Sequence, residues 1–243
     1  MNDRNESLLF AENVVKDFGG LRAVNGASLR IAEGEIRGLI GPNASGKTTL
    51  VNLITGIYRL TEGAIYFLGD RIDGLQPNVM ASKGIMRTFQ ISRVFRDMTV
   101  LENMMVPALS QGQTMPEART RAQELLEFAL LSRLMGEPAK SLSGGQNMLL
   151  QIVRGFMNEN LRLYIMDEPF AGVHQSIKGI ILKTINTMNR EKGITFLIIS
   201  HEMTTVSNVC HRITVLNKGE VISEGTMEEV ANDPQVIDAY LGG

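Results

Sequence analysis

The residues best suited to chemistry form the stretch GPNASGKTT at positions 41–49. Gly41, Gly46, Lys47 and Thr48 fit the pattern GxxxxGK(S/T). In such a loop the backbone N–H groups point at phosphates, and the following helix adds the positive end of its dipole. Lys47 would reach the β- and γ-phosphates, and the Thr48 hydroxyl would hold Mg²⁺. We therefore predict a nucleoside triphosphate site here.

The flanks of this stretch distinguish a phosphate loop from a glycine-rich turn that has no ligand. Residues 35–40 (EIRGLI) are mostly apolar, as a buried parallel strand would be. After the loop, apolar residues recur at the spacing of one helix face, at Leu50, Leu53, Ile54 and Ile57. Strand, loop and helix in this order are the context that a phosphate site requires.

A second chemical pair, Asp167 and Glu168, directly follows the apolar stretch LRLYIM. An unpaired carboxylate at the end of a buried strand would be costly, but beside Mg²⁺ and a triphosphate it can bind the ion or its water. Glu168 is then placed to orient or deprotonate the attacking water. The alternative is that one of the two carboxylates only caps the following segment.

Two further polar residues are weaker candidates. His201 follows the apolar stretch ITFLIIS, where an imidazole could contact the γ-phosphate and sense its hydrolysis. Gln90 lies among apolar residues, and its amide could contact Mg²⁺ or water. By themselves, His201 could equally be structural and Gln90 could equally be a surface residue.

The stretch SGGQ, residues 143–146, suggests a second anion-binding site at a helix start. Ser143 can cap the helix, and Gly144 with Gly145 lets backbone N–H groups approach a phosphate. Alone, this pattern would be a common helix cap. The chain nevertheless has two stretches suited to bind a phosphate, and only the first of them contains a lysine, Lys47.

The elements that must position these residues indicate an α/β fold. Residues 8–35 resemble β structure, and strands and helices alternate after residue 35, which predicts a mostly parallel sheet covered on both faces. Residues 99–140 are helical in character, with Pro116 as a first helical residue. An apolar stripe follows it at Ala118, Ala122, Leu125, Leu126, Ala129 and Leu130. The phosphate loop, Asp167–Glu168 and His201 all lie at strand ends, where ligands of such sheets bind.

Composition narrows the function classes. The chain has 243 residues, a net charge of −2 and one cysteine, Cys210. The charge gives no reason to expect nucleic acid as a partner, and a single cysteine excludes an internal disulfide and suits a reducing compartment. The N-terminus lacks the apolar core of a secretory leader, and no apolar run approaches the ~20 residues that span a bilayer. We therefore expect any membrane role to come through a partner.

Taken together, these motifs resemble those of the ATP-binding subunits of ABC transporters over essentially the whole chain. GPNASGKTT is similar to the Walker A motif, LSGGQ to the signature motif, and LYIMDEP to Walker B with Glu168 as the catalytic glutamate. Gln90 fits the Q-loop, His201 the switch histidine, and Phe18 the aromatic residue that stacks on adenine. From the residues alone, Phe18 could equally be a core phenylalanine.

The resemblance implies a set of site residues and the cofactors ATP and Mg²⁺. Nucleotide would be bound by Phe18, Gly41, Pro42, Asn43, Ala44, Ser45, Gly46, Lys47, Thr48 and Thr49. The metal would be held by Thr48, Gln90 and Asp167. In this family two subunits pair head to tail, so that ATP on one phosphate loop is capped by the partner's signature motif, here Leu142, Ser143, Gly144, Gly145 and Gln146.

Several stretches are similar to the branched-chain amino acid importer group, among them FGGLRAVNGASL, RTFQ, DEPFAGV and VIDAYLG. Subunits for urea, short amides and lipopolysaccharide share parts of them. The resemblance implies a peripheral cytoplasmic ATPase on the inner face of the membrane. It would work with two permease subunits and, indirectly, an extracytoplasmic solute-binding protein. The paired ATPase could be a second copy or a paralogue.

A soluble ABC ATPase acting on DNA or ribosomes is the rival of a different class. It is disfavoured because the chain has one phosphate loop and too few residues between Lys47 and Ser143 for a coiled coil. A phosphate-loop kinase or GTPase would not explain LSGGQ. The sequence does not identify the transported solute, because the membrane subunits and the binding protein select it.

The resemblance also predicts the domain organisation. We expect one ABC ATPase domain, with residues 1–90 and 156–243 as the nucleotide-binding core and residues 91–155 as a helical subdomain. The segment after Gln90 mixes apolar residues such as Phe95 with Arg93 and Arg96, which suits a surface that receives a partner's helix.

The chain departs from the family pattern in three places. Ala44 stands where glycine is usual, His174 where the D-loop normally carries Asp or Asn, and Asn147 with Met148 where basic residues are usual. The His174 departure puts a contact across the subunit interface in doubt. None of the three removes a residue that the chemistry requires.

Overall fold

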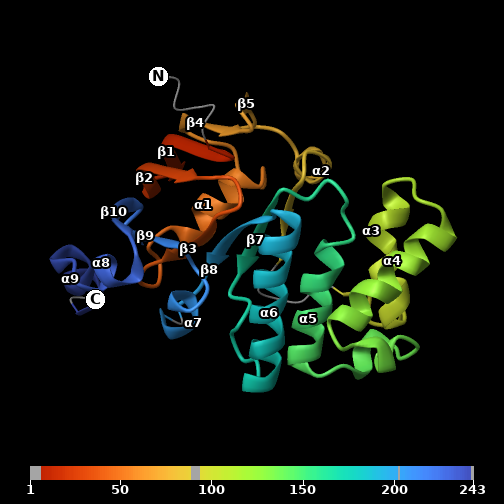
Figure 1. Cartoon of the computed structure of the whole chain (residues 1–243). Helices are drawn as coiled ribbons and strands as arrows, with labels where there is room; N and C mark the ends of the chain where they lie inside the picture. Colours follow the sequence, from red (N-terminus) through yellow and green to blue (C-terminus); the bar gives the residue numbers. More distant parts are fainter. Residues whose placement is uncertain (1–6, 89–93, 202, 242–243) are drawn as a thin grey trace.

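A six-stranded sheet carries most of the predicted site residues at its strand ends (Figure 1). The computed structural model describes residues 7–88, 94–201 and 203–241. The strand order is β10-β9-β3-β8-β7-β6, and all neighbours are parallel except β10, which is antiparallel to β9. The strands are β3 (Ile36–Ile40), β6 (Ile85–Arg87), β7 (Leu163–Asp167), β8 (Thr195–Ile199), β9 (Arg212–Asn217) and β10 (Glu220–Gly225). The prediction of a mostly parallel sheet is confirmed.

A second, antiparallel sheet is formed by the N-terminal part of the chain. Its order is β2-β1-β4-β5. The strands are β1 (Leu9–Phe18), β2 (Leu21–Ile31), β4 (Glu62–Phe67) and β5 (Asp70–Arg71). Gly19, with a φ of 57°, allows the tight turn between β1 and β2. The prediction of β structure over residues 8–35 is therefore confirmed as well.

The helices begin at residues that can satisfy their first N–H groups. Thr99, Thr114 and Ser143 each form a capping box with a Glu or Gln three residues later, at the starts of α3, α4 and α5. The helices before and within this region are α1 (Lys47–Ile54), α2 (Pro77–Ser82), α3 (Val100–Ser110), α4 (Met115–Phe128) and α5 (Gly144–Gly155). The short 3₁₀ turns η1 (Ser132–Leu134) and η2 (Ala139–Ser141) connect α4 to α5.

The remaining helices follow the strands of the large sheet. They are α6 (Gln175–Lys192), α7 (Met203–Ser207), α8 (Met227–Ala231) and α9 (Pro234–Leu241). Gly193 ends α6 in the left-handed conformation, with a φ of 65°, as glycine does at many helix C-termini. Figure 1 shows α8 and α9 beside β10 at one end of the large sheet, and α3 and α4 at the other.

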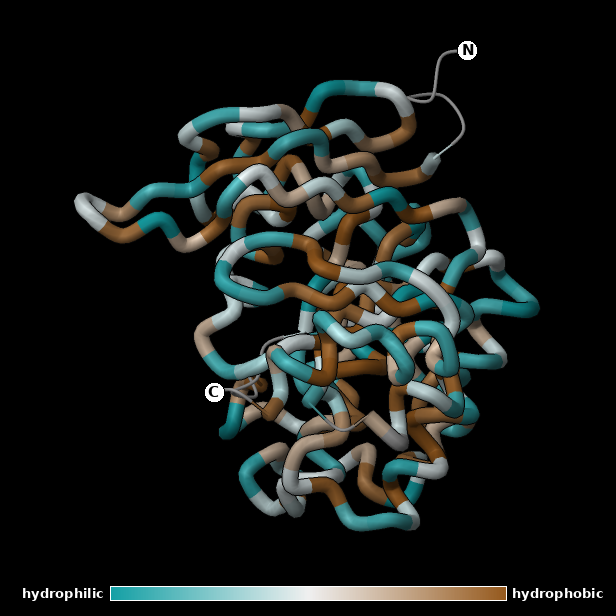
Figure 2. The backbone as a smooth tube through the Cα atoms, turned by 90° about the vertical axis from the view of Figure 1, so that its left-hand side faces the viewer, coloured by the Kyte–Doolittle hydropathy of each residue, from teal (hydrophilic) through white to brown (hydrophobic). Residues whose placement is uncertain are grey.

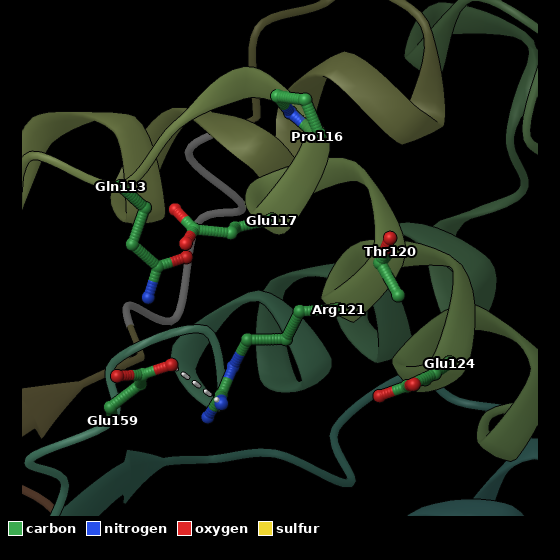
Figure 3. A pocket seen from close by; sticks show the side chains of 7 residues that line it. All are labelled: Gln113, Pro116, Glu117, Thr120, Arg121, Glu124 and Glu159. Atoms are coloured by element: carbon green, nitrogen blue, oxygen red, sulfur yellow. Dashed lines mark hydrogen bonds and ion pairs between the residues drawn. The ribbon is translucent and has the colours of Figure 1, made fainter.

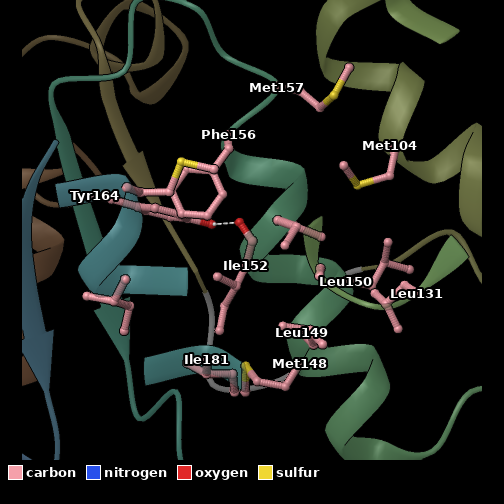
Figure 4. Packing of buried hydrophobic residues seen from close by; sticks show 14 of the residues in the cluster. Met104, Leu131, Met148, Leu149, Leu150, Ile152, Phe156, Met157, Tyr164 and Ile181 are labelled. Carbon is pink, nitrogen blue, oxygen red and sulfur yellow. Dashed lines mark hydrogen bonds between the residues drawn. The ribbon is translucent and has the colours of Figure 1, made fainter. Parts of the chain in front are cut away.

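Buried apolar side chains fill the space between these layers, and Figure 2 shows apolar segments gathered inside the molecule with polar segments on the outer loops. One cluster joins α3–α6 to the sheet, with Leu149, Ile152 and Phe156 of the α5 face packed near Tyr164 (Figure 4). The Tyr164 hydroxyl donates to the carbonyl of Ile152 at 2.9 Å. Leu149 and Ile152 thus lie on the buried face of α5.

Two residues of the predicted apolar stripes do not lie on a buried face. Ile57 follows the end of α1 and is 42% exposed, because Gly56 turns the chain with a φ of 72°. Leu130 follows the end of α4 in the left-handed conformation and is 72% exposed. In both cases the helix ends before the sequence periodicity does.

None of the helices in the described part of the chain combines the length and hydropathy that crossing a membrane requires.

Candidate functional site

The loop between β3 and α1 is built around two glycines that no other residue could replace without a shift. A Cβ on Gly41 would lie 2.0 Å from the carbonyl oxygen of Leu216 in β9. A Cβ on Gly46 would lie 2.5 Å from the carbonyl oxygen of Ala23 in β2. Both glycines have positive φ, 149° and 104°. Backbone atoms of both sheets therefore lie close to the loop and restrict its conformation.

Lys47 folds back over this loop. Its ammonium donates to the carbonyls of Gly41 and Pro42, each at 2.8 Å, and to the Ser45 hydroxyl at 3.3 Å. Burial lowers the pKa of Lys47, while the carboxylates of Glu168 and Asp167 raise it. The loop, the lysine and the two acidic residues thus share one electrostatic environment, as the strand-end argument predicted.

A pocket of about 470 Å³ lies beside the loop. It is lined by residues 44–49 and by Leu21, Arg22, Ala23 and Lys218. The last four were not predicted, since they come from β2 and the β9–β10 turn, which no motif marks. Phe18 is absent from this lining; its ring is 41% exposed and meets Tyr58 edge-on, with centroids 5.2 Å apart.

Asp167 is buried at the end of β7 and is paired with a residue that the sequence did not single out. Its Oδ2 accepts from Nη2 of Arg87 at 2.7 Å, and its backbone N–H donates to the Thr88 hydroxyl at 3.1 Å. The guanidinium compensates the buried carboxylate. A charged residue at the end of the short strand β6 was the available signal for Arg87.

Glu168 and His201 meet at the ends of β7 and β8. Oε1 of Glu168 lies 2.9 Å from Nδ1 of His201, and the carboxylate is 12% exposed while the imidazole is 65% exposed. Glu168 has a φ of 51°, and its N–H donates to the carbonyl of Ile199 at 2.8 Å. A non-glycine residue held in this strained region is typical of functional sites. Gln90 lies outside the described residues.

The signature residues Leu142–Gln146 surround the start of α5. Ser143 is the N-cap and its hydroxyl accepts from the N–H of Gln146 at 3.3 Å, while Leu142 is buried. Ser143 and Gly144 are exposed, and a Cβ on Gly144 would meet no other atom within 4 Å. The backbone at this helix start is therefore open to an anion. None of these five residues lines the pocket beside the phosphate loop.

The two unusual positions have clear conformations. Ala44 has a φ of 61°, a conformation that favours the glycine usual there. His174 is the N-cap of α6, where its Nδ1 accepts from the N–H of Ser176 at 3.4 Å. His174 thus takes over the capping that an Asp or Asn would perform at the same position.

A separate cavity of about 510 Å³ lies between α4 and the segment that follows α5 (Figure 3). It is lined by acidic residues such as Glu117 and Glu124, and Arg121 bridges it to Glu159 at 3.1 Å. None of the predicted site residues lines it. Its acidic lining disfavours the binding of a phosphate, and it shares no lining residue with the pocket beside the phosphate loop.

Two sequence families match the chain. The family described as ABC transporter matches residues 24–171, which include the phosphate loop, the signature motif and Asp167–Glu168. The family described as branched-chain amino acid ATP-binding cassette transporter matches residues 220–243. The C-terminal segment, which includes α8 and α9, is therefore similar to the branched-chain cassette family in particular.

Relatives with names and solved structures agree with these matches. A protein of Methanocaldococcus jannaschii named probable branched-chain amino acid transport ATP-binding protein LivG is 38% identical over 97% of both chains. A nucleotide-free ATP-binding cassette from an ABC transporter superposes with a TM-score of 0.87 at 36% identity, covering 98% of this chain and 100% of the other. A dimeric cassette in a post-hydrolysis state, bound to ADP and phosphate, gives a TM-score of 0.81 at 28% identity over 90% and 98% of the two chains. The chain therefore belongs to the family of ATP-binding cassettes, the ATPases of ABC transporters.

Proposed function

We propose that this chain is the ATP-hydrolysing subunit of an importer for branched-chain amino acids. The match of residues 220–243 to the branched-chain cassette family carries this proposal, because those residues lie outside the match to ABC transporters in general, residues 24–171. The M. jannaschii relative described above bears the same assignment in its name along nearly its whole length. The relatives and structures reported above give no support to urea, short amide or lipopolysaccharide transport.

The phosphate loop binds the triphosphate in this proposal, through the backbone and side chains of residues 41–49. The pocket beside the loop, with Leu21, Arg22 and Lys218, has room for the ribose and base. Phe18 is exposed enough to offer one ring face to adenine, with Lys16 already 4.9 Å from its centroid. Arg22 is bound to Asp17 by two hydrogen bonds, which fixes the wall of the pocket.

The residues present fit a Mg²⁺ ion. Thr48 lies in the first turn of α1, and the buried Asp167 supplies a carboxylate at the end of β7. Magnesium prefers such oxygen ligands and keeps waters and phosphate oxygens in its remaining positions. When bound, it would neutralise charge on the β- and γ-phosphates. Gln90 completes the proposed set of metal-binding residues.

Glu168 binds the attacking water in this proposal, and His201 fixes the orientation of the Glu168 carboxylate. The carboxylate is largely buried, which keeps it in one orientation, and its contact with Nδ1 of His201 fixes it further. Glu168 accepts a proton from the water as the water oxygen bonds to the γ-phosphorus, and the bond from that phosphorus to the bridging oxygen breaks, which leaves ADP and inorganic phosphate. Lys47 and the N-terminus of α1 stabilise the negative charge of the transferred group.

A second cassette completes the site. The open start of α5 is remote from the chain's own pocket, so its exposed N–H groups are available to ATP on another subunit. The dimeric cassette reported above supports this pairing. We propose a head-to-tail dimer with a second copy or a paralogue, in which residues 142–146 cap the ATP of the partner.

The permease contacts the boundary between the two parts of the cassette, residues 1–90 with 156–243 and residues 91–155. A pocket of about 310 Å³ lies there, lined by residues of both parts, among them Met86, Phe95, Pro107 and Tyr164. The Phe95 ring is 49% exposed, and the guanidinium carbon of Arg154 lies 6.0 Å from its centroid. An exposed aromatic ring above an apolar pocket suits an inserted permease helix. Arg93, the other residue expected to contact it, lies outside the described residues.

This arrangement places the cassette on the cytoplasmic face of the membrane with two permease subunits, and an extracytoplasmic protein delivers the solute. The test is uptake into vesicles that contain the complex of this chain with the permeases encoded beside its gene. Leucine, isoleucine and valine should be taken up with ATP inside, whereas urea or acetamide should not. Uptake of urea in place of leucine would overturn the solute assignment.

The same vesicles test the permease contact. Phe95→Ala should reduce uptake severalfold while the ATPase rate of the isolated subunit stays nearly unchanged. Leu130→Ala removes an even more exposed apolar side chain that does not line this pocket, so it serves as the control. Normal uptake with Phe95→Ala would place the coupling surface elsewhere.

A further inference from the structure

Arg87, at the end of β6, joins two elements that carry proposed metal-binding residues. Its Nη2 donates to Oδ2 of Asp167, at the end of β7, at 2.7 Å, and its Nη1 donates to the side-chain oxygen of Asn52 in α1. Asn52 follows Thr48 by four residues, so the two lie on one face of the helix. One guanidinium therefore bridges the helix of Thr48 and the strand of Asp167.

Asp167 is bound at its carboxylate and at its backbone by two consecutive residues. Arg87 binds the carboxylate, and the buried hydroxyl of Thr88 accepts from the N–H of Asp167 at 3.1 Å. The side chains of Arg87 and Asp167 are each only 8% exposed, so the ion pair lies in surroundings of low dielectric. Oδ1 of Asp167 takes no part in this ion pair and can serve Mg²⁺ or one of its waters.

Charge compensation alone does not explain both contacts of Arg87. A buried carboxylate requires a nearby cation, and any cation beside Asp167 would supply it. Asn52 is neutral and has no such requirement. A guanidinium is planar and its donors point in fixed directions, so bonds from two of its nitrogens fix two acceptors relative to each other.

We propose that Arg87 is a positioning residue of the metal site, which holds the Asp167 carboxylate in place relative to α1 and its Thr48. The inference rests on the proposed Mg²⁺ site at Thr48 and Asp167. Arg87 itself has no acceptor for a metal and acts through the carboxylate that it binds. Loss of a side chain that orients a metal-binding carboxylate typically costs about 10- to 100-fold in metal affinity or activity.

Three roles of Arg87 predict different outcomes when the guanidinium is removed. If Arg87 supplied only charge, Arg87→Gln would leave Asp167 uncompensated, and the carboxylate would attract Mg²⁺ more strongly. If Arg87 were only structural, the variant would lose stability and keep the same Mg²⁺ requirement. A positioning role predicts a higher Mg²⁺ requirement, because the carboxylate is free to turn away from α1.

The experiment uses full-length proteins and three measurements. These are Tm, the Mg²⁺ concentration that gives half the maximal ATPase rate, and the Kd of a fluorescent ATP analogue in Mg²⁺ and in EDTA. We expect Arg87→Gln to raise the Mg²⁺ requirement about tenfold and to weaken binding in Mg²⁺ but not in EDTA. Arg87→Lys should recover much of the Tm and little of the Mg²⁺ requirement, because an ammonium lacks the planar fork.

Arg37→Gln is the matched control for loss of a buried arginine. The Arg37 side chain is 3% exposed and pairs with Glu35 at 2.6 Å and with Glu224 at 2.8 Å. Neither carboxylate belongs to the proposed metal site. This variant should lower Tm and leave the Mg²⁺ requirement at the wild-type value.

Asn52→Ala tests the bridge to α1 in a protein that keeps the ion pair of Arg87 with Asp167. Only one hydrogen bond is lost, so folding should be preserved. The Mg²⁺ requirement should rise about two- to fivefold, the equivalent of that bond. If Arg87→Gln does not fold, Asn52→Ala and Arg87→Lys decide the question by the same measurements.

The role of Arg87 is overturned if Arg87→Gln lowers the Mg²⁺ requirement or leaves it unchanged. It is also overturned if Asn52→Ala has no effect on that requirement, or if Arg87→Lys restores it fully. Asp167→Asn in the same assay tests the metal site itself. A normal Mg²⁺ requirement in Asp167→Asn would overturn the site and this inference together. A raised requirement there, with none in Arg87→Gln, would overturn the role of Arg87 alone.

Discussion

Glu168 Oε1 and His201 Nδ1 lie 2.9 Å apart, joining the end of β7 to the end of β8. The two residues are far apart in sequence, and the parallel pairing of their strands brings them together. A carboxylate accepts a hydrogen bond, so Nδ1 of His201 carries a proton in this contact. The other ring nitrogen of His201, Nε2, takes no part in this contact.

Replacement of Glu168 by Gln should keep ATP bound and abolish turnover. The amide preserves the shape of the side chain but cannot accept a proton from water, so kcat should fall roughly 100-fold or more. Steady-state ATPase assays at saturating ATP check this, with Glu124→Gln of the acidic cavity as the control. A nearly normal rate in Glu168→Gln would remove Glu168 from its proposed role.

ATP should drive two Glu168→Gln subunits together, and a bulky cation at the start of α5 should prevent it. Ser143→Arg places a large cation beside the exposed Gly144, where a Cβ would meet no other atom within 4 Å. Light scattering with and without ATP measures the pairing. Ser110→Arg, a change of the same kind at the exposed end of α3, should leave it intact.

Dimers that persist in Ser143→Arg would contradict the role of the signature motif. A monomer at high concentration in Glu168→Gln with ATP would instead favour an obligate paralogous partner over a homodimer.

His174 should prove replaceable by any good helix cap. His174→Asp supplies a carboxylate to the same N–H of Ser176 and should equal or exceed the wild type in stability, with a modest change in ATPase rate. His174→Ala removes the acceptor and should cost about 1 kcal/mol. Urea denaturation ranks the three proteins. Complete loss of ATP-driven pairing in His174→Asp would mean that His174 has a contact in the dimer that Asp cannot make.

Ala44→Gly should stabilise the protein. Ala44 has a φ of 61°, which penalises any residue with a Cβ, and glycine relieves this at the expense of a more flexible unfolded chain. We expect a gain of up to about 1 kcal/mol in the free energy of unfolding. Ala231→Gly, in the exposed last position of α8, should have the opposite sign. Equal effects at the two positions would show that the φ of Ala44 is not strained in solution.

Cys210 should make stability depend on pH in the alkaline range. Burial raises the pKa of its thiol from 9.0 to about 12, with Arg37 opposing. Below pH 9 both states keep the proton, so the thiol has no effect there. As the pH rises from 9 toward 12, the unfolded chain releases the proton first and stability falls. Cys210→Ala should flatten this decline in urea unfolding at pH 7.5 and 10. A decline of equal slope in both proteins would assign it to other groups.

The sequence predicted those features that depend on local pattern. Apolar runs identified β3, β7 and β8, and the phosphate-loop pattern with its flanks located the candidate site, because strand ends of a parallel sheet converge. Ser143 marked the start of α5 correctly, and Pro116, predicted as a first helical residue, lies one residue after the start of α4 at Met115. The helix ends were less predictable, since Gly56 and the positive φ of Leu130 interrupt the apolar periodicity.

The contacts that sequence analysis missed are those made between distant segments. Arg87 pairs with Asp167 across 80 positions, and the Gly219 N–H donates to the Ser45 carbonyl at 2.9 Å from a hairpin near the other end of the chain. No periodicity or spacing reports such pairs, because they depend on strand order. Sequence analysis missed Leu21 and Lys218 as lining residues of the pocket for the same reason.

The packing of Gly145 has a consequence for how two ATP molecules are consumed. A Cβ on Gly145 would lie 3.4 Å from Ile177 and 3.5 Å from Val173, so the start of α5 rests on the segment that runs from Glu168 into α6. In the proposed dimer, one end of this contact faces the partner's ATP and the other belongs to the chain's own water-activating residue. Hydrolysis at either site would then affect the other site through this contact within each chain. The two turnovers would follow one another in a cooperative sequence, and would not occur as independent events.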